Sequence, residues 1–571
     1  MGSARLRIVA MLVVALVLAG MVWTRLAYWQ VVQHGQLTVQ AQAQYRELVP
    51  LPALRGAVFD RNLTQLVVNT TVYSAFVSPD QVAAGQRDAV ATGLSTVLGV
   101  DRAKVMTTLQ SNSKFAYIAR RFAKAKADQL RTLKLPGVGM QEETQRSYLP
   151  GIGSGTSLAA NLLGFVDWNG AGNYGLEANY QKALAGTPGY ISSYRDLANR
   201  EIVLGTHTHQ DPVNGQNLVL SLDANIQYAA EQALMEGVKR DRAESGSVLI
   251  MDPTTGGIVA WADYPSYNAN DFNHTDTALF KDNVLSYVYE PGSVMKVVTL
   301  AGAINVGAIQ PNTVINDPGV LNVGGYRIYD WDRRNHGNVD YTYVLEHSLN
   351  VGAMKAMLAE GHPAFYNNLQ AFGLTSPSGI DVAGENFIPP PAAAKMQDSQ
   401  YATTAFGQGI DVNMVQMLAA VNVVANGGKF APPHVVERIG THLNPVVLQP
   451  QRQVISAATA AKMTTMMQAV VQHGSGWTSR IPGFQLDQCG KTGTSQIPVN
   501  GKYTDDVWAS FVGFLPAKKP RFTMLVVVRK PHYPGSDGDW TLNDGYMTAE
   551  PIWKQIAQTL VVNWHITPDP H

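Results

Sequence analysis

The first pattern along the chain is an apolar run from Ile8 to Trp23, which contains no charged residue. With Thr24 added, its length is at the short end of the roughly 17–25 residues that span a bilayer as a helix. Arg5 and Arg7 precede this run, and the positive-inside tendency therefore predicts a cytoplasmic N-terminus. The pattern indicates a membrane-spanning helix that is followed by an extracytoplasmic chain.

Two interpretations of the apolar run stay open. The aromatic residues between Trp23 and Trp29 fit an interfacial belt, which favours a retained anchor. Alternatively, Val17-Leu18-Ala19 provides a small-residue cleavage site of the kind that ends a signal peptide. We expect a cytoplasmic tail at residues 1–7 and a transmembrane helix at residues 8–24. Under either interpretation the bulk of the protein leaves the cytoplasm.

Residues 25–212 combine several patterns, which we assign to a stalk and an elongated pedestal domain. Leu26 to Val49 is rich in glutamine and predicts a mostly helical stalk. Arg55 to Asn62 is a compact, turn-rich element. The basic run between Phe115 and Leu135 predicts a solvent-exposed helix face, with a membrane or partner contact as the minor alternative.

After a turn signal at residues 211–215 the periodicity changes, and we assign residues 213–571 to a second domain. Strand and hairpin patterns come first, helices occupy the centre, and two strands and a helix close the chain. This order predicts an α+β fold, an α/β/α sandwich built on an antiparallel sheet. The expected elements are strands or helices at Asn217–Leu222, Ala224–Val238, Gly246–Asp252, Gly257–Ala262, Ser293–Val306, Val344–Glu360, Trp508–Leu515, Phe522–Arg529 and Pro551–Val562.

Composition excludes some classes of function. The 571 residues include 43 basic and 43 acidic side chains, so the formal net charge is +0. A nucleic-acid partner usually requires a basic excess, and we expect none. The single cysteine, Cys489, cannot form an intrachain disulfide, and we interpret it as a buried strand residue. The histidines show no metal-ligand spacing, so we predict neither a metal nor a cofactor.

Three short motifs follow one another in the second domain. They are S-x-x-K at Ser293–Lys296, S-x-N at Ser348–Asn350 and K-T-G at Lys491–Gly493. The first two patterns also occur elsewhere, at Ser111–Lys114 and Ser266–Asn268, where we interpret them as chance matches. The order and spacing of the three motifs together are therefore the signal.

Ser293 follows Pro291-Gly292 and opens an apolar-periodic run, which predicts that it lies at a helix N-terminus. Unsatisfied N–H groups and the helix dipole favour developing negative charge there. Lys296 is three residues further on, so its amine can reach the Ser293 hydroxyl. Lysine is a base only when it is neutral, and burial or a second cation such as Lys491 would lower its pKa. Helix capping is the alternative role for the serine.

The other motifs supply the remaining groups. Ser348 can relay a proton to or from a leaving amine, and the amide of Asn350 can bind both a lysine amine and a substrate carbonyl. Capping is again the alternative.

Lys491 and Thr492 can bind a carboxylate, and Gly493 permits close approach of a substrate backbone. The N–H of Thr494 with that of Ser293 would form an oxyanion hole. A phosphate-binding loop is excluded because Gln485 stands where that motif requires glycine.

On these residues the chain resembles the class B penicillin-binding proteins, monofunctional peptidoglycan transpeptidases of the serine β-lactamase-like fold. The resemblance covers nearly the whole chain. Within the class, the motifs of this chain are most similar to those of the division branch. Beyond the three motifs it rests on Arg55-Gly56, Asp60-Arg61-Asn62, Gly175-Leu176-Glu177, Glu290-Pro291-Gly292, Phe406-Gly407-Gln408-Gly409 and Ser510-Phe511-Val512-Gly513.

Two positions depart from the family pattern. Leu63 stands where a glycine is usual, and Val294-Met295 replaces the commoner Thr-Phe pair. Neither change removes a group that the chemistry needs.

The resemblance implies that Ser293 attacks the penultimate D-alanine of a stem peptide with Lys296 as base, while Lys491, Thr492 and Thr494 hold the terminal carboxylate. An amine from a neighbouring strand then resolves the acyl-enzyme, which makes a septal cross-link. β-Lactams would acylate the same serine. The resemblance also implies a membrane glycosyltransferase of the SEDS family and other division proteins as partners.

Two alternatives remain at this stage. A D-alanine carboxypeptidase or β-lactamase-type hydrolase would use the same groups with water as acceptor. A non-catalytic septal scaffold or β-lactam sensor would use the serine only as a receptor.

Overall fold

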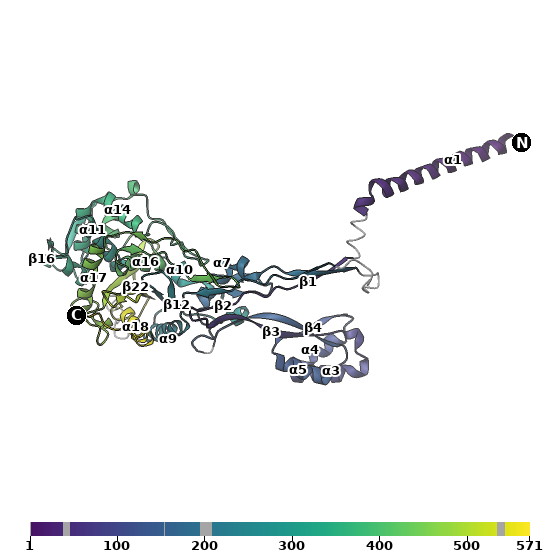
Figure 1. The fold of residues 1–571 in the computed structure, drawn as a ribbon, viewed down its shortest axis with the longest axis horizontal. Helices are drawn as coiled ribbons and strands as arrows, with labels where there is room; N and C mark the ends of the chain where they lie inside the picture. Colours follow the sequence, from purple (N-terminus) through teal and green to yellow (C-terminus); the bar gives the residue numbers. More distant parts are fainter. Residues whose placement is uncertain (1, 38–45, 154, 195–207, 534–542, 571) are drawn as a thin grey trace. The chain divides into compact units, whose positions relative to one another are not determined.

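The computed structural model describes residues 2–37, 46–153, 155–194, 208–533 and 543–570. The chain divides into two compact units. The first comprises residues 1–55 and 185–215, and the second comprises residues 56–184 and 216–571. Figure 1 shows the ribbon of the chain.

The first unit contains the apolar helix and a small sheet. Helix α1 (Gly2–Ala27) continues into a π-helical turn (Tyr28–Val32), and the helical segment is long and apolar enough to cross a membrane. Strand β8 (Gly189–Tyr194) pairs antiparallel with β1 (Arg46–Leu51) and with β9 (Thr208–Gln210). The helical stalk expected at Leu26–Val49 is therefore wrong at residues 46–49, which belong to β1, and its residues 38–45 lie outside the described part of the chain.

The second unit begins with a seven-stranded sheet in the order β19-β18-β10-β2-β3-β4, with β5 paired to β3. Strand β3 and its partner β5 form the longest ladder of this sheet. The sheet also contains β10, β18 and β19, which come from later parts of the chain. The strands are β2 (Val58–Phe59), β3 (Gln65–Val77), β4 (Ala116–Phe122), β5 (Val138–Tyr148), β10 (Leu218–Leu220), β18 (Val436–Ile439) and β19 (Asn444–Pro445).

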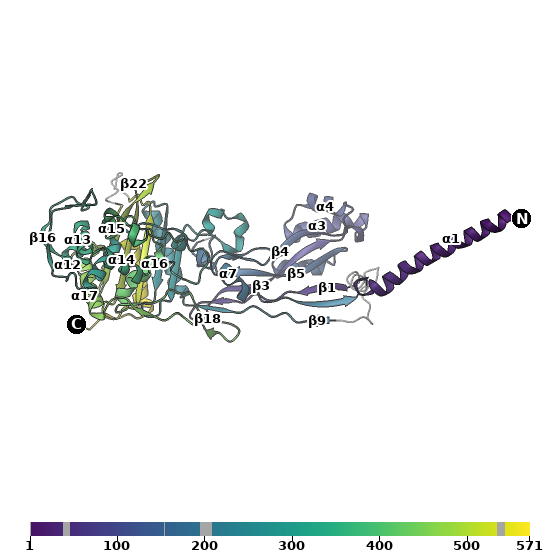
Figure 2. The same ribbon diagram turned by 90° about the horizontal axis from the view of Figure 1, so that it is seen from above.

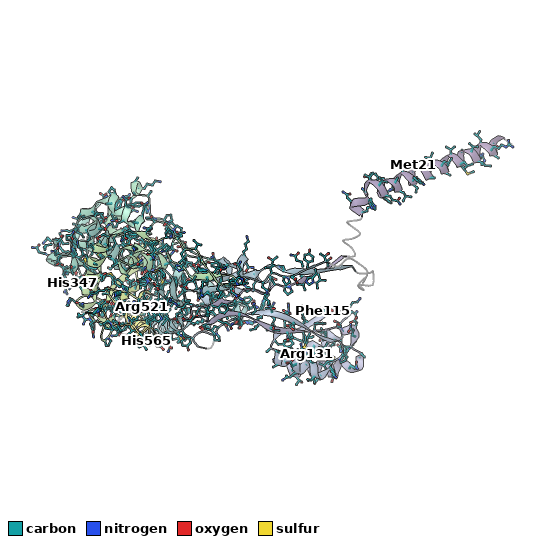
Figure 3. All side chains as sticks on the ribbon, viewed as in Figure 1. Met21, Phe115, Arg131, His347, Arg521 and His565 are labelled. Carbon is teal, nitrogen blue, oxygen red and sulfur yellow. The ribbon has the colours of Figure 1, made fainter. Side chains whose placement is uncertain are left out.

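Three helices form a small lobe on this sheet, with its own apolar core. They are α3 (Arg87–Leu98), α4 (Arg102–Leu109) and α5 (Lys124–Leu133). Figure 2 shows α3 and α4 beside β4 and β5, and Figure 3 places Phe115 and Arg131 on this lobe.

The basic run at residues 115–135 is only partly helical. Arg120 and Arg121 lie on β4, and each donates to Glu143 of β5 at 3.3 Å. The Arg121 guanidinium also stacks 3.8 Å from the centre of the Trp168 ring. The helix expectation is therefore wrong for the first half, because pairing with β3 makes it a strand, and right for the basic face of α5.

A five-stranded antiparallel sheet organises the rest of the unit, in the order β12-β11-β23-β22-β21. Two early strands and three late strands therefore form one sheet, and β21 lies at its edge. The strands are β11 (Ser245–Met251), β12 (Ile258–Tyr264), β21 (Cys489–Val499), β22 (Lys502–Leu515) and β23 (Phe522–Arg529).

Helices cover both faces of this sheet, so β11, β12 and β23 are buried at nearly every position. Along β11, Val248 and Ile250 pack with α9 (Ala224–Arg240) and α18 (Ala549–Asn563), whereas Leu249 and Met251 pack in the opposite core. The opposite core includes residues of α11 (Met295–Asn305), α13 (Asn350–Glu360), α14 (His362–Ala371), α16 (Met414–Ala425) and α17 (Ala457–Gln472). Figure 1 shows α9 and α18 on one side of the sheet and α11 and α16 on the other.

The expected α/β/α sandwich on an antiparallel sheet is thus confirmed, together with most of the elements predicted for it. One expected helix is wrong in detail. Residues 344–360 belong to two helices, α12 (Tyr341–Glu346) and α13, separated by a turn at His347–Leu349. That turn contains Ser348.

Small hairpins and helical pieces connect these layers. Two hairpins pair β6 (Phe165–Val166) with β7 (Gly172–Asn173) and β14 (Val320–Val323) with β15 (Tyr326–Tyr329). Two further two-stranded sheets pair β13 (Val314–Asp317) with β16 (Gly337–Asp340) and β17 (Lys429–Phe430) with β20 (Arg452–Gln453). The short helices are α6 (Ala160–Leu163), α7 (Gly175–Asn179), α8 (Gln181–Ala185), α10 (Asn283–Ser286) and α15 (Asp398–Thr404).

Candidate active site

Ser293 lies in a 3₁₀ turn (Gly292–Val294) that runs directly into α11. The expectation of a helix start at this serine is confirmed. Gly292 has φ +55°, and a Cβ on it would lie 2.7 Å from the carbonyl oxygen of Thr494. Only glycine lets the serine turn pack this closely against β21. The fold therefore places the S-x-x-K serine beside the K-T-G strand.

Lys296 connects the first two motifs. Its ammonium nitrogen, Nζ, lies 3.0 Å from Ser293 Oγ and 2.8 Å from Asn350 Oδ1. It also donates to the carbonyl oxygen of Ser348 and lies 3.3 Å from the Ser348 hydroxyl. The side chain is fully buried. Lys296 is therefore held by four oxygen atoms, one of which is the candidate nucleophile.

The environment of Lys296 favours its neutral form. Burial lowers its pKa well below the usual lysine value, and the positive charge of Lys491 lowers it further. The nearby carboxyl groups of Asp330 and Asp317 act in the opposite direction. Since a lysine must be neutral to accept a proton, the balance suits a general base.

The turn between α12 and α13 presents Ser348 in a left-handed conformation, with φ +60°. A non-glycine residue in this region carries strain, which is commonly found at functional sites. The turn aims the Ser348 hydroxyl between the two lysines, and Asn350 opens α13 next to it. The turn between the helices and the first residue of α13 thus supply the groups that contact Lys296.

Lys491 lies on the edge strand β21 and is fully buried. Its Nζ lies 3.0 Å from the Ser348 hydroxyl and 3.0 Å from the Thr492 carbonyl oxygen. Burial lowers the pKa of Lys491 to about 7, with Glu550 opposing the change. Two lysines therefore share the Ser348 hydroxyl.

The residues that follow Lys491 line the cleft. Thr492 Oγ1 lies 2.8 Å from the hydroxyl of Ser475, and Thr494 Oγ1 accepts from the Gly545 N–H at 3.3 Å. A Cβ on Gly493 would lie 2.9 Å from the Pro291 carbonyl oxygen. Gly493 is thus needed for packing against the serine turn.

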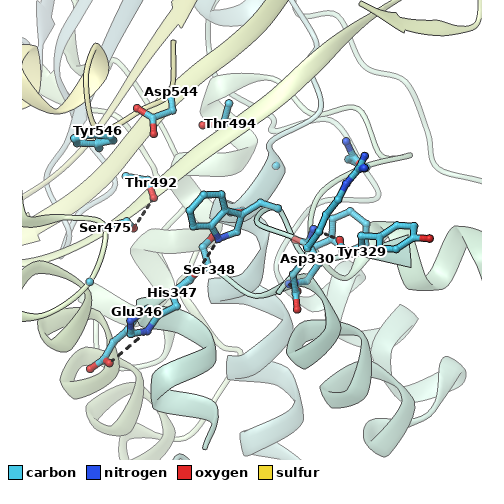
Figure 4. Close-up of a pocket in the computed structure, with 18 of the residues that line it drawn as sticks. Tyr329, Asp330, Glu346, His347, Ser348, Ser475, Thr492, Thr494, Asp544 and Tyr546 are labelled. Carbon is cyan, nitrogen blue, oxygen red and sulfur yellow. Dashed lines mark hydrogen bonds and ion pairs between the residues drawn. The ribbon is translucent and has the colours of Figure 1, made fainter. Parts of the chain in front are cut away.

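These side chains border a cavity of about 580 Å³. Figure 4 shows Ser348, Thr492 and Ser475 close together, with His347 and Glu346 beside them. Trp331 and Trp477 also line the cavity, and their side chains are 60% and 55% exposed. The cavity is large enough for a peptide end and has aromatic groups at its mouth.

The structure brings all of the predicted site residues into this one region, from the 3₁₀ turn before α11, from α11, α13 and β21, and from the turn before α13. Sequence reasoning missed several others, because they belong to no motif. Among them are Ser475 and Trp477 after α17, Asp330 beside Asn350, and Asp317, which neighbours Asp330. Apart from the aromatic Trp477, their only sequence signal is a small or acidic residue near a turn.

The remaining motif matches behave as expected. Ser111 is exposed and its hydroxyl donates to the Thr108 carbonyl oxygen at 2.7 Å. Ser266 donates to Asn161 at 2.9 Å. Cys489 is fully buried on β21, and burial raises the pKa of its thiol. None of these side chains borders the cavity of Ser293.

Comparison with known proteins defines the family. Residues 246–558 match the penicillin binding protein transpeptidase domain, and residues 50–220 match the penicillin-binding protein dimerisation domain. The chain therefore belongs to the penicillin-binding protein transpeptidase family, as the resemblance of its motifs indicated.

Two relatives and one solved structure illustrate the similarity. The chain is 30% identical over 595 residues to penicillin-binding protein PbpB of Mycobacterium tuberculosis, covering 98% of this chain and 85% of that protein. It is 28% identical over 516 residues to peptidoglycan D,D-transpeptidase FtsI of Escherichia coli, covering 89% and 84%. The structure of penicillin-binding protein 3 from Mycobacterium tuberculosis, complexed with ampicillin, is 25% identical with a TM-score of 0.69, covering 92% of this chain and 98% of that one.

Proposed function

We propose that this protein is a peptidoglycan D,D-transpeptidase that cross-links stem peptides at the division septum through an acyl-serine intermediate. The observation that carries the proposal is the contact between Lys296 Nζ and Ser293 Oγ, at 3.0 Å, inside a buried two-lysine network. The names of its relatives, a peptidoglycan D,D-transpeptidase and two penicillin-binding proteins, support the same activity.

In the first step, neutral Lys296 takes the Ser293 proton while Ser293 Oγ bonds to the carbonyl carbon of the penultimate D-alanine. The carbonyl oxygen becomes an oxyanion, which the N–H groups of Ser293 and Thr494 stabilise. The C–N bond to the terminal D-alanine then breaks. Its nitrogen takes a proton through Ser348, which both lysines contact.

Residues of the edge strand β21 bind the substrate. Lys491, Thr492 and Thr494 hold the carboxylate of the terminal D-alanine, because an ammonium and two hydroxyl groups satisfy a carboxylate. Asn350 positions Lys296 through the 2.8 Å hydrogen bond to its side-chain oxygen. A β-lactam carries a comparable carboxylate and a strained amide, so it acylates Ser293.

In the second step the acyl-enzyme is resolved by an amine. The amine nitrogen of a neighbouring stem peptide bonds to the acyl carbon, its proton passes to the basic network, and the Ser293 ester bond breaks. Ser293 recovers its proton from Lys296. The product is an amide cross-link and the free enzyme.

The domain arrangement in this proposal follows the two family matches. Residues 25–212 form the stalk and pedestal and residues 213–571 the transpeptidase domain, which the matches at 50–220 and 246–558 support. The apolar helix anchors the chain in the cytoplasmic membrane, with the N-terminus inside and the catalytic domain outside. The pedestal contacts a SEDS-family glycosyltransferase and other division proteins.

Acyl transfer to an amine tests the proposal directly. The detergent-solubilised full chain is incubated with a thioester analogue of the stem-peptide end and a D-amino acid. We expect an aminolysis product, and we expect Ser293→Ala to give neither aminolysis nor labelling by a fluorescent penicillin. Hydrolysis without aminolysis would identify a carboxypeptidase instead. Labelling without turnover would identify a sensor.

A further inference from the structure

Asp330 fixes the start of the helix that carries Asn350. Its side chain is 1% exposed, and its Oδ1 accepts the N–H groups of Asn350 and Val351 at 2.5 and 2.9 Å. The neighbouring carbonyl oxygen of Tyr329 accepts from the Asn350 amide at 2.9 Å. Asn350 is therefore held through both its backbone and its side chain by the loop that contains Asp330.

A second buried carboxyl group, Asp317, lies against Asp330. Its side chain is 0% exposed, and its Oδ1 accepts the Gly319 N–H at 2.9 Å. Burial raises the pKa of Asp317, the Gly319 N–H lowers it, and the neighbouring Asp330 carboxyl raises it again through its side chain and its charge. The loop is closed by a hydrogen bond of 3.1 Å from the Asp330 N–H to the Gly319 carbonyl oxygen.

Each carboxyl group has one oxygen atom without a donor. Oδ2 of Asp317 and Oδ2 of Asp330 are buried and accept no hydrogen bond from the part of the chain that the structure describes. Two adjacent ionised carboxylates repel each other strongly in a buried site. One proton between the two oxygens removes both the repulsion and the two unsatisfied acceptors.

We propose that Asp317 and Asp330 share one proton, and that this singly charged pair positions Asn350 and sets the negative charge that Lys296 faces. Asp330 is then a positioning residue, which acts through Asn350 and through the electrostatic effect of its negative charge on Lys296. The inference deepens the proposed function, on which it rests, because it concerns the base of the same reaction.

A pair with one negative charge suits both stages of the proton transfer. Lys296 faces Lys491 on β21, the carboxyl groups of Asp317 at the end of β13 and Asp330 after β15, and the neutral groups of Ser348 and Asn350. Asp317 in turn faces Asp330 and His336. With two negative charges Lys296 would hold its proton too firmly to act as base. With none, the ammonium that forms when Lys296 takes the Ser293 proton would lack a counter-charge.

The test is the pH profile for acylation of the full chain by a fluorescent penicillin. Asp317→Asn reproduces the protonated state of Asp317, since its amide can donate to Asp330 Oδ2. We expect the midpoint of the acid limb of this variant to stay in place.

Asp330→Asn keeps a capping oxygen but moves the charge to Asp317. We expect the acid limb to shift to lower pH by about half a unit or more, because Lys296 loses its nearer counter-charge. Asp340→Asn is the matched control. Asp340 caps α12 through the Tyr343 N–H at 2.8 Å, and it is not among the charges that shift the Lys296 pKa. Its profile should match wild type.

An acid limb that moves as far in Asp317→Asn as in Asp330→Asn would show two ionised carboxylates and overturn the inference. An unchanged pH profile in Asp330→Asn would also overturn the inference. If Asp317→Asn does not fold, the infrared difference spectrum between wild type and Asp330→Asn at neutral pH decides. Loss of one protonated-carboxyl band supports the shared proton, and its retention contradicts it. Absence of acylation in the wild type would instead refute the proposed function.

Discussion

At the scale of single residues, the site places two lysines in a buried position around one hydroxyl. Lys296 and Lys491 approach Ser348 Oγ at 3.3 and 3.0 Å, and both are 0% exposed. Two charged ammonium groups in such a place would be costly, so at least one is favoured in its neutral form. The same burial that prepares the base therefore reduces the stability of the fold.

This cost predicts that Lys491→Met is more stable than wild type but inactive. The folded pKa of Lys491 is about 7, below its unfolded value, so the unfolded chain binds more protons between pH 7 and about 10.4. Wild-type stability therefore rises with pH in that window. We expect the gain of Lys491→Met to be about 1–3 kcal/mol at pH 7, after the loss of three hydrogen bonds, and to shrink toward pH 10.

Chemical denaturation at several pH values measures this difference. Lys104→Met is the control, because Lys104 is exposed on α4 and should give a small difference without pH dependence. A gain at Lys491 that grew with pH, or a loss of stability at pH 7, would contradict the assigned pKa direction.

Sequence reasoning identified the residues with reactive groups, since serine, lysine and asparagine at these spacings carry the chemistry themselves. It did not identify Asp330, which lies 20 residues before Asn350 in the chain and acts only through a loop closure. An acidic residue at a turn has many possible roles, and only the fold shows which N–H groups it meets.

At the scale of secondary-structure elements, glycines allow the serine turn to pack against its neighbours. Gly407 has φ +86°, and a Cβ on it would lie 2.1 Å from the carbonyl oxygen of Gly292. The Gly292 N–H in turn donates to the Gly407 carbonyl oxygen at 3.0 Å. The position of Ser293 therefore depends on the backbone of the turn after α15.

We predict that Gly407→Ala displaces this turn and lowers the acylation rate by at least about tenfold, because small misplacements of reacting groups are costly. Its stability should fall by more than the roughly 1–2 kcal/mol of a left-handed non-glycine residue. Gly307→Ala is the matched control, since Gly307 has φ +78° with no atom within 4 Å of an added Cβ. The free energy of unfolding of Gly307→Ala should fall by about 1 kcal/mol, and its acylation rate should equal that of the wild type. Equal effects in the two variants would refute the steric argument.

The elements that the sequence predicted poorly share one physical cause. Residues 46–51 and 116–122 are strands because of partners distant in the chain, β8 and β3. Local periodicity carries little information about such pairing. The break at His347–Leu349 depends on the left-handed Ser348, whose conformation the tertiary contacts impose. Elements with strong local patterns, such as the hairpin of β11 and β12, were predicted correctly.

At the scale of the whole molecule, the membrane orientation is open to a direct chemical test because the chain has one cysteine. Cys489 is fully buried, and burial raises the pKa of its thiol. Thiolates are the reactive form of cysteine, so the wild-type chain should react poorly with maleimides. Any labelling of a cysteine variant then reports the introduced position.

We predict that Ser111→Cys reacts with a membrane-impermeant maleimide on intact protoplasts, whereas Ser3→Cys reacts only after the membrane is opened. Ser111 is exposed on the pedestal sequence, and Ser3 precedes the apolar run. Arg5 and Arg7 favour a cytoplasmic location for that end. Mass spectrometry of the labelled chain identifies the modified residue.

Each other outcome has a distinct meaning, because the two cysteines lie on either side of the only membrane-spanning candidate among the described residues. Labelling of Ser3→Cys on intact protoplasts would reverse the orientation and place the catalytic cavity on the wrong side for a cell-wall substrate. A chain that lacks the Ser3→Cys label even after lysis, while Ser111→Cys is labelled, would have lost its first residues by signal cleavage. A carboxypeptidase or transpeptidase could act in that released form. Processive cross-linking beside a membrane glycosyltransferase requires the anchor, so retention of the label supports the septal proposal.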